Sequence, residues 1–349
     1  MKAAILENQG VMTYKEVTTP APEPGHVRLQ VKAVSICGSD IKRYVSGHRL
    51  YPLILGHECA GIIDSVGEGV SADLIGKHAS VIPVVPCFEC EQCQRGLYSA
   101  CHSYSFIGSR QAGGFADYLA LPERNVLIVP DELPFEFVAL IEPSTVARHM
   151  LALGDFKQGQ TAVVLGAGSI GLMIAQWLRI LGASLIICTD ISDDNLETAR
   201  KLGAHVTLNP LRDDVVAEVR RLTGDGVDIS LEAAGVPQTL EQTVPLTRPR
   251  GKVICGGNQP LDKSLPMSFI ENMMRRELSL IGCFMSYSAP FPGHEWADTV
   301  AALLDGGLDM ETMISHRYSL AETPDVFAQI GAHSLTHRKI MLYPEGAGA

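Results

Sequence analysis

The chain has 349 residues, of which 46% are hydrophobic, 19% are charged and 6% are aromatic. Its 28 Lys and Arg residues against 39 Asp and Glu residues give a net charge of −11, which argues against nucleic acids and anionic membranes as partners. The start of the chain has no apolar run typical of a secretion signal, and glycines, Gln176 and Arg179 interrupt the most apolar stretch, 161–188. We therefore expect a cytoplasmic enzyme of about two domains.

The predicted elements of the first 145 residues are short strands separated by Gly and Pro. Apolar runs predict strands at 27–34, 54–66, 78–85 and 115–121. Short strands interrupted by turns are typical of an irregular, β-rich domain.

From residue 159 onward the predicted elements alternate between strand and helix. We predict strands at 162–165, 184–189, 205–208, 227–231, 252–256 and 279–281, and helices at 169–181, 193–202, 213–222 and 238–244. This alternation indicates a doubly wound parallel sheet with helices on both faces. The rest of the chain, with a helix at 296–304 and a strand at 339–342, is short for an independent domain, so we expect it to return to the first one.

Four cysteines lie close together as C-x2-C-x2-C-x7-C, at Cys87, Cys90, Cys93 and Cys101. Four thiolates in such a short run can surround one Zn²⁺, which would stabilise a lobe with little apolar core. The bacterial iron–sulfur run has three residues before its last cysteine, whereas here the gap is seven. Disulfides are the other alternative, and the lack of a secretion signal disfavours them. The spacing predicts a structural zinc site.

A glycine-rich motif follows the predicted strand 162–165 and opens the next helix. Gly166, Gly168 and Gly171 match G-x-G-x-x-G, with Ser169 and Ile170 inside the motif. Such glycines let the backbone approach a pyrophosphate at the helix N-terminus. Asp190 ends the following strand, where a carboxylate binds the ribose 2′-hydroxyl and repels a 2′-phosphate, so NAD is favoured over NADP. The alternative is a purely structural turn.

Three further segments carry donors typical of a catalytic metal: Cys37-Gly-Ser39-Asp, Gly56-His57-Glu58 and Ile141-Glu142-Pro143. Each alone is compatible with ordinary packing. Together they offer a thiolate, an imidazole and a carboxylate, which could hold Zn²⁺ with one position open to substrate. The residues alone leave open whether these donors meet in space.

In combination, these motifs resemble the zinc-containing medium-chain alcohol and polyol dehydrogenases over essentially the whole chain. The resemblance implies a GroES-like, β-rich catalytic domain at 1–145 that carries the structural zinc lobe. It also implies a Rossmann dinucleotide-binding domain at 146–285 and a return to the catalytic domain at 286–349. The active site would lie in the cleft between the two domains. The family further implies two Zn²⁺ per chain, NAD as cofactor and a homodimer or homotetramer.

The resemblance also implies roles for individual residues. The catalytic zinc is expected on Cys37, His57 and Glu142, with Glu58 beside it as a transient ligand. Ser39 is expected to take the hydroxyl proton and His48 to end the relay. The alternatives are a helix cap for Ser39 and an ordinary surface side chain for His48.

The expected reaction is the oxidation of a secondary hydroxyl of a sugar alcohol. Stretches such as Phe106-IGSR, Glu232-AAGVPQT and Tyr287-SAPFPGHEW resemble the branch of the family that acts on galactitol 1-phosphate. A phosphate needs a basic partner, for which Arg110 and Arg43 are the main candidates, with Arg49 and Arg148 behind them. Sorbitol, xylitol, L-galactonate and threonine remain alternative substrates, and a non-catalytic nucleotide-binding protein is the alternative of another class.

Overall fold

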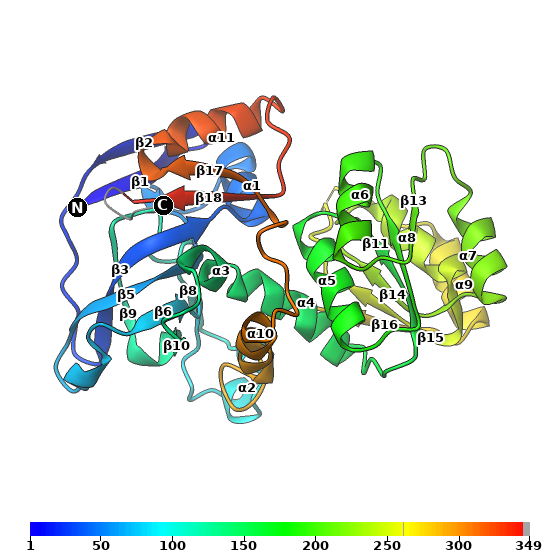
Figure 1. The fold of residues 1–349 in the computed structure, drawn as a ribbon, viewed down its shortest axis with the longest axis horizontal. Helices are drawn as coiled ribbons and strands as arrows, with labels where there is room; N and C mark the ends of the chain where they lie inside the picture. Colours follow the sequence, from blue (N-terminus) through cyan, green and yellow to red (C-terminus); the bar gives the residue numbers. More distant parts are fainter. Residues whose placement is uncertain (261, 345–349) are drawn as a thin grey trace. The chain divides into compact units, whose positions relative to one another are not determined.

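A computed structural model describes residues 1–260 and 262–344 and divides the chain into two compact units (Figure 1). The first contains Met1–Glu142, Tyr287–Leu304 and the chain from Met310 onward, and the second contains Pro143–Ser286 and Asp305–Asp309. Helix α4 (Ile141–Leu153) begins in the first unit and continues in the second. Among the described residues, no helix is both long and apolar enough to span a bilayer.

The first unit is built on a seven-stranded sheet in which β3 (His26–Ser35) has three neighbours. Its strands run in the order β10–β6–β5–β3–β18–β17, with β9 also paired to β3. Their bounds are Glu58–Val66 for β5, His78–Val81 for β6, Tyr118–Pro122 for β9, Val126–Ile128 for β10, Ile314–Ser319 for β17 and Lys339–Tyr343 for β18. The C-terminal strand β18 therefore lies beside β3, and this pairing returns the chain to the first unit.

Two smaller sheets and several helices complete the first unit. One sheet contains β2 (Val11–Glu16), β1 (Lys2–Asn8) and β4 (Leu53–Ile54), and the other contains β7 (Val84–Val85) and β8 (Ser105–Phe106). The helices are α1 (Gly38–Ser46), α2 (Glu91–Gln94), α3 (Phe135–Ala139), α10 (His294–Leu304) and α11 (Thr323–Gly331). Apolar side chains of the sheets and of α11, among them Leu29, Phe115 and Phe327, form the core of this unit.

Three predicted strands of this unit differ from the structure, because two are interrupted and the third begins later than predicted. The predicted strand 54–66 breaks at Gly56, whose φ is +89° and whose missing Cβ would lie 2.5 Å from the ring of Phe115. The predicted strand 78–85 breaks at Pro83, so β6 and β7 belong to different sheets. Phe115 lies outside the third strand, which is Tyr118–Pro122. The break at Gly56 has a consequence for function, because it leaves His57 and Glu58 at the start of β5.

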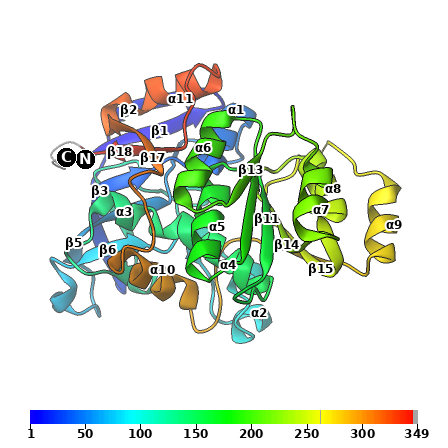
Figure 2. The same ribbon diagram turned by 45° about the vertical axis from the view of Figure 1, so that its right-hand side comes forward.

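The second unit is a six-stranded parallel sheet in the order β13–β12–β11–β14–β15–β16, which confirms the predicted doubly wound α/β fold. Its strands are β11 (Thr161–Leu165), β12 (Leu185–Thr189), β13 (Val206–Leu208), β14 (Val227–Glu232), β15 (Thr247–Cys255) and β16 (Ser279–Gly282). Its helices after α4 are α5 (Ser169–Ile180), α6 (Asp193–Leu202), α7 (Val215–Thr223), α8 (Pro237–Leu246) and α9 (Met267–Arg275). Figures 1 and 2 show α5 and α6 on one face of the sheet and α7 and α8 on the other.

Candidate active site and metal centres

Cys37 is held at the N-terminus of α1 by a capping arrangement. Its Sγ accepts the backbone N–H of Ser39 at 3.5 Å, and the carboxylate of Asp40 accepts the backbone N–H of Cys37 at 3.1 Å. A side chain that caps its own helix cannot rotate freely, so both the thiol and the buried carboxylate are fixed in place. Because Cys37 is the cap, Ser39 lies inside the first turn and is not the cap of this helix.

His57 and Glu58 approach Cys37 because of the register between β3 and β5. Ser35, at the end of β3, pairs with Glu58, at the start of β5, and Cys37 follows Ser35 by two positions. The donor atoms of Cys37, His57 and Glu58 all lie within 4.8 Å of one another, and His57 and Glu58 are buried. The structure therefore joins a thiol, an imidazole and a carboxylate in one unit.

The imidazole of His57 lies between Asp40 and Phe106. Its Nδ1 lies 3.6 Å from Asp40 Oδ1, and its ring meets the ring of Phe106 edge-on at 5.3 Å. Burial disfavours the protonated ring, but the negative charges of Asp40 and Cys37 outweigh burial and hold the pKa of His57 well above its ordinary value. The same negative potential would attract a metal cation.

Glu58 is paired with a buried lysine from the end of the chain. Lys339 Nζ donates to both carboxylate oxygens of Glu58 at 2.6 Å, and the hydroxyl of Ser35 donates to one of them. The two charged side chains are only 1% and 3% exposed. Burial alone would lower the pKa of Lys339, but the charge of Glu58 reverses this effect and raises it. The pairing of β18 with β3 places the lysine here.

Glu142 lies at the start of α4 and is also buried, but it does not belong to the group of donors within 4.8 Å. Burial, with the charges of Glu58 and Asp40, raises its pKa to about 7, although His57 and Lys339 oppose this. Carboxylates thus crowd around one thiol and one imidazole. A Zn²⁺ fits such a donor set, because it would balance the excess negative charge with ligands that zinc prefers.

The remaining predicted residues of this region have other partners. The hydroxyl of Ser39 accepts from Arg43 Nη1 at 2.8 Å, and Arg43 also contacts Asp40 at 3.3 Å. The ring of His48 bonds the carbonyl of Ser109 at 2.8 Å. Among the described residues, no hydrogen bond joins Ser39 to His48.

Arg110, the other arginine expected to bind a phosphate, is folded back onto its own loop. Its guanidinium stacks on the ring of Tyr104 at 3.8 Å and donates to the Tyr104 carbonyl at 2.6 Å.

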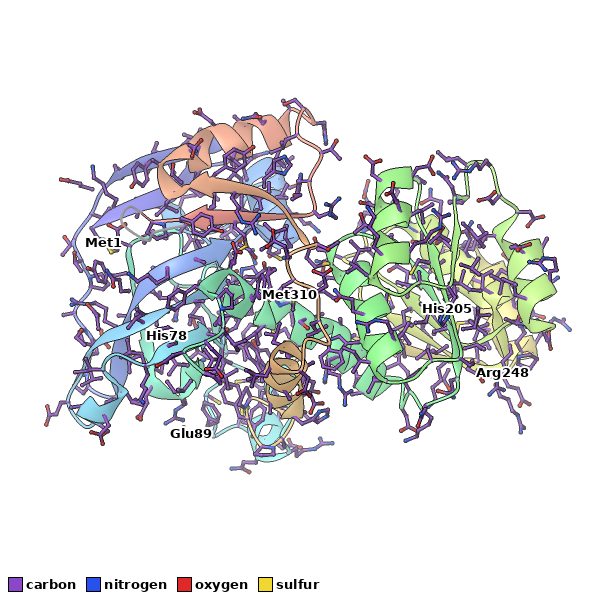
Figure 3. The ribbon with its side chains drawn as sticks, in the orientation of Figure 1. Met1, His78, Glu89, His205, Arg248 and Met310 are labelled. Carbon is purple, nitrogen blue, oxygen red and sulfur yellow. The ribbon has the colours of Figure 1, made fainter. Side chains whose placement is uncertain are left out.

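The four cysteines of the C-x2-C-x2-C-x7-C run converge in a lobe around α2, near the labelled Glu89 in Figure 3. Contacts between their sulfur atoms include separations of 3.5 Å for Cys87 and Cys101, and 3.9 Å for Cys87 and Cys93 and for Cys90 and Cys101. A tetrahedron of sulfurs with Zn–S bonds of about 2.3 Å has edges of about 3.8 Å, so the lobe has the size of a zinc site.

Backbone N–H groups also favour the thiolate form in this lobe. The sulfur of Cys87 accepts the N–H of Cys90 at 3.3 Å. Hydrogen bonds from the backbone of Glu89 and Cys90 lower the pKa of Cys87 to about 6. A thiolate held in this way is the form that binds a metal.

The glycine-rich motif forms a tight turn between β11 and α5. A Cβ on Gly171 would lie 1.8 Å from the carbonyl oxygen of Gly166, and Gly166 itself has a φ of +97°. A Cβ on Gly168, the N-cap of α5, would meet nothing within 4 Å. Gly166 and Gly171 therefore build the turn. Gly168 leaves space for a phosphate at the N-terminus of α5, whose first turn contains Ser169 and Ile170.

Asp190 holds the glycine-rich turn from the end of β12. Its carboxylate accepts the N–H of Ala167 at 2.8 Å and the N–H of Ser192 at 2.8 Å. The side chain therefore orders the turn as well as carrying the negative charge that a ribose hydroxyl would meet.

Sequence reasoning missed two residues of the first centre, Asp40 and Lys339. Asp40 does carry a signal, because it stands three positions after Cys37, where an acidic residue completes a capping box. Lys339 has none, since a lysine before an apolar strand is ordinarily a solvated residue.

Comparison with known proteins relates both units to one enzyme family. A family profile described as a zinc-binding dehydrogenase matches residues 169–305, and one described as an alcohol dehydrogenase GroES-like domain matches residues 23–131.

Individual relatives match almost the whole chain. It is 35% identical to galactitol 1-phosphate 5-dehydrogenase of Escherichia coli K12, over 99% of this chain and 100% of the relative. It is 33% identical to sorbitol dehydrogenase of Bacillus subtilis, over 99% of this chain and 97% of the relative.

Solved structures agree with this relationship. The crystal structure of galactitol-1-phosphate dehydrogenase from Escherichia coli matches with a TM-score of 0.94 and 34% identity, over 99% of this chain and 100% of that one. A zinc-binding dehydrogenase from Sinorhizobium meliloti bound to NADP matches with a TM-score of 0.91 and 30% identity, over 98% of this chain and 99% of that one. Together with the profiles, these matches show that the chain is an oxidoreductase and belongs to the zinc-containing medium-chain alcohol and polyol dehydrogenases.

Proposed function

We propose that this enzyme oxidises a secondary hydroxyl of a sugar alcohol, with NAD as the hydride acceptor, and that galactitol 1-phosphate is its substrate. The observation that carries the proposal is the convergence of Cys37, His57 and Glu58 in the first unit. The open glycine-rich turn of the second unit supports the cofactor part of the proposal, because it suits the pyrophosphate of a dinucleotide.

For the catalytic metal we propose Cys37, His57 and Glu142 as ligands, with Glu58 beside them. Glu58 gives both of its oxygens to Lys339, which competes with any metal for the carboxylate. Glu142 is buried with a raised pKa, so a cation would stabilise its charged form. A bound Zn²⁺ would supply Lewis-acid chemistry by lowering the pKa of the substrate hydroxyl.

The protein's own side chains would handle the proton that leaves the hydroxyl. We propose that Ser39 acts as a relay, in which Oγ accepts this proton while it releases its own toward His48, because the hydroxyl lies in the first turn of α1, two residues after Cys37. The guanidinium of Arg43 donates to Ser39 Oγ and thereby orients it. Transfer from Ser39 to His48 would need a bridging group, since each of the two side chains bonds a different partner.

For the cofactor, the charge of Asp190 supports NAD over NADP. A carboxylate at the end of β12 would accept a hydrogen bond from the ribose 2′-hydroxyl and repel a 2′-phosphate. The relative from Sinorhizobium meliloti was solved with NADP, so the fold accommodates either dinucleotide, and the choice depends on this local charge.

A second candidate substrate is an unphosphorylated polyol such as sorbitol. One observation favours it: Arg43 is bonded to Ser39 and Asp40, and Arg110 is bonded to Tyr104. A phosphate would have to displace these partners before either arginine could bind it. The identity of 33% to a sorbitol dehydrogenase is also close to the 35% identity to the galactitol 1-phosphate enzyme.

The test is NADH formation, followed at equal concentrations of galactitol 1-phosphate, galactitol, sorbitol, xylitol, L-galactonate and threonine. We expect kcat/KM to be highest for galactitol 1-phosphate. A higher value for sorbitol or galactitol would replace the phosphorylated substrate by a free polyol, and no turnover of any polyol would contradict the proposed function.

Metal analysis of Cys37→Ser tests the metal assignment separately. We expect zinc to fall from two ions to about one per chain, with turnover lost and NADH binding retained, because the four-cysteine lobe keeps its own ion. Retained turnover would contradict the role given to Cys37.

We further propose that the protein acts as a homodimer, with a tetramer as a possible larger assembly. Strand β16 ends the parallel sheet and leaves one row of backbone groups without a neighbouring strand. Exposed apolar side chains lie on β16 itself, shortly after it and on the preceding helix α9: Leu280, Phe284, Met267, Ile270 and Met274. Two copies related by a two-fold axis could pair their β16 strands antiparallel and cover this surface.

The cytoplasm is the proposed location. None of the nine cysteines, all of which lie in the described part of the chain, forms a disulfide, which suits a reducing compartment.

A further inference from the structure

The segment from Tyr287 to Trp296 packs on the four-cysteine lobe through one aromatic ring. The ring of Phe291 meets Phe88 edge-on at 5.2 Å and Tyr98 edge-on at 5.2 Å. Phe88 stands between the first two cysteines of the lobe, and Tyr98 stands between the last two. Two rings from inside the metal-binding run therefore hold one ring from a segment almost 200 residues later in the chain.

The close approach of this segment requires a glycine in the lobe. A Cβ on Gly96 would lie 2.6 Å from the Cβ of Ala289, so a larger residue would push the two segments apart. Aromatic rings thus hold the two segments together, and the lack of a side chain at Gly96 allows their backbones to approach closely.

The aromatic contacts continue from Phe291 toward the catalytic donors. Phe291 stacks on Tyr287 at 5.8 Å, and Tyr287 stacks on the buried ring of Trp296 at 6.1 Å. The hydroxyl of Tyr287 accepts the backbone N–H of Val84 at 3.2 Å. This bond fixes the start of β7 to the segment.

Strand β7 carries the connection to the catalytic histidine. Val84 pairs with Phe106 in the two-stranded sheet of β7 and β8. The ring of Phe106 lies edge-on against the imidazole of His57, with 5.3 Å between the ring centroids. Every step between the four-cysteine lobe and His57 is therefore a direct contact, and all of these residues belong to the first unit.

We propose that the four-cysteine lobe and the catalytic metal centre are energetically coupled through this series of contacts, with Phe291 and Tyr287 as positioning residues. A lobe closed around its metal fixes the positions of Phe88 and Tyr98, and these two rings fix Phe291. Phe291 packs on Tyr287, whose hydrogen bond to Val84 then fixes the position of Phe106 beside His57. The coupling is reciprocal, so loosening the aromatic contacts weakens metal retention in the lobe as well. The inference goes beyond the proposed function, because it does not depend on which alcohol is oxidised.

The physical basis is the small core of the lobe. Its described side chains offer few buried apolar groups other than Cys93 and Cys101, so its order depends on the metal and on the rings around it. Edge-to-face and stacked ring pairs contribute beyond their buried area. Removing the ring of Phe291 deletes three such pairs at once, two of them with the lobe.

The test uses full-length protein loaded with ¹¹³Cd²⁺, whose NMR resonance differs between a four-thiolate site and a site with mixed donors. In Phe291→Leu we expect the lobe to lose metal to a chelator on the order of ten-fold faster. We also expect the resonance of the mixed-donor site to shift or broaden. Phe291→Tyr keeps the ring and should restore both properties.

Two further variants separate coupling from a general loss of stability. Phe135→Leu removes a ring that contacts His78 and neither metal centre, so both resonances should stay as in the wild type. Tyr287→Phe keeps the ring stack but removes the acceptor for Val84, so it should shift the mixed-donor resonance while increasing metal loss from the lobe less than Phe291→Leu does. This second variant also covers the case in which Phe291→Leu does not fold.

The proposal is overturned if Phe291→Leu and Tyr287→Phe leave the mixed-donor resonance unchanged. It is also overturned if Phe135→Leu shifts that resonance equally. A wild-type spectrum with only the four-thiolate resonance would refute the catalytic metal site itself, and the coupling with it. Failure of the proposed substrate would show in the turnover assay alone and would leave these spectra as expected.

Discussion

At the scale of single residues, the buried charges around Cys37 decide how the catalytic donors are held. Asp40 and Glu58 are acidic, and Lys339 and Arg43 contact them directly. A buried charge that loses its partner is strongly unfavourable, because water cannot replace the missing interaction. We therefore expect that replacing one residue of the Glu58–Lys339 pair lowers the stability of the protein, even though neither residue need touch the substrate.

Lys339→Met should destabilise the first unit by about 3–5 kcal/mol, because it leaves the carboxylate of Glu58 buried and unpaired. The measurement is urea unfolding followed by fluorescence. The double variant Lys339→Met with Glu58→Gln removes both charges and should recover a large part of the loss. A single variant as stable as the wild type would contradict the importance of this buried pair for stability.

Asp190 orders the glycine-rich turn through its hydrogen bonds, and we propose that its charge also selects the cofactor. Two substitutions separate these roles. Asp190→Asn removes the charge but keeps an acceptor oxygen, so it should narrow the preference for NAD over NADP by about ten-fold with little effect on stability. Asp190→Ala also loses the bonds to Ala167 and Ser192, so it should raise KM for both cofactors. An unchanged ratio of kcat/KM for the two cofactors in both variants would remove Asp190 from cofactor selection.

At the scale of elements, the turn between β11 and α5 shows how glycines divide two tasks. Gly171 allows helix α5 to pack against the carbonyl of Gly166. Gly168 instead has no protein atom within 4 Å of the position of a Cβ, so a ligand can approach its backbone. The same change, a single added methyl group, should therefore affect stability at Gly171 and cofactor binding at Gly168.

Gly171→Ala should destabilise the second unit by roughly 1–3 kcal/mol, because the new methyl group meets a backbone oxygen that cannot move aside. Gly168→Ala should change stability by less than about 0.5 kcal/mol and should weaken NADH binding, because its methyl group would occupy the face that a pyrophosphate approaches. Urea unfolding and titration of NADH fluorescence measure the two effects. Unchanged NADH affinity in Gly168→Ala would place the dinucleotide elsewhere.

The elements also explain where predicted strands failed. A run of apolar residues predicts a strand but does not show whether the strand stays in one sheet. The left-handed backbone at Gly56 interrupts the predicted strand 54–66 near its start, and Pro83, which lacks an N–H, interrupts the predicted strand 78–85. Because of the break at Gly56, His57 lies just before β5 and not within a regular strand. The break therefore helps to position His57 in the candidate site.

At the scale of the whole molecule, the open edge of the parallel sheet is the feature that points to assembly. The exposed apolar side chains of α9 and β16 are a liability for an isolated chain, since unpaired strand edges and apolar patches promote association. A closed two-fold dimer would remove this liability.

Leu280→Lys should convert the proposed dimer to a monomer, because each copy would place a charged side chain in the apolar surface that the dimer would bury. Sedimentation velocity measures the mass of the assembly. Leu211→Lys is the matched control: Leu211 is 77% exposed and lies beyond β13 at the opposite edge of the sheet. A monomeric wild type, or a dimeric Leu280→Lys, would contradict the proposed interface.

The sequence by itself determined the features whose residues lie close together along the chain. The spacing of Cys87, Cys90, Cys93 and Cys101 limits the lobe to a small volume, and the glycine-rich motif can form only a turn before a helix. The alternation of strand and helix likewise implied the parallel sheet, because burial on both faces demands continuous apolar strands.

Tertiary structure alone decided which distant side chains meet. The register of β3 with β5 places Glu58 in the donor group with Cys37 and His57, and the pairing of β18 with β3 brings Lys339 to Glu58 from 281 positions away. Such contacts depend on strand register and on burial, and neither is encoded in the local spacing of residues.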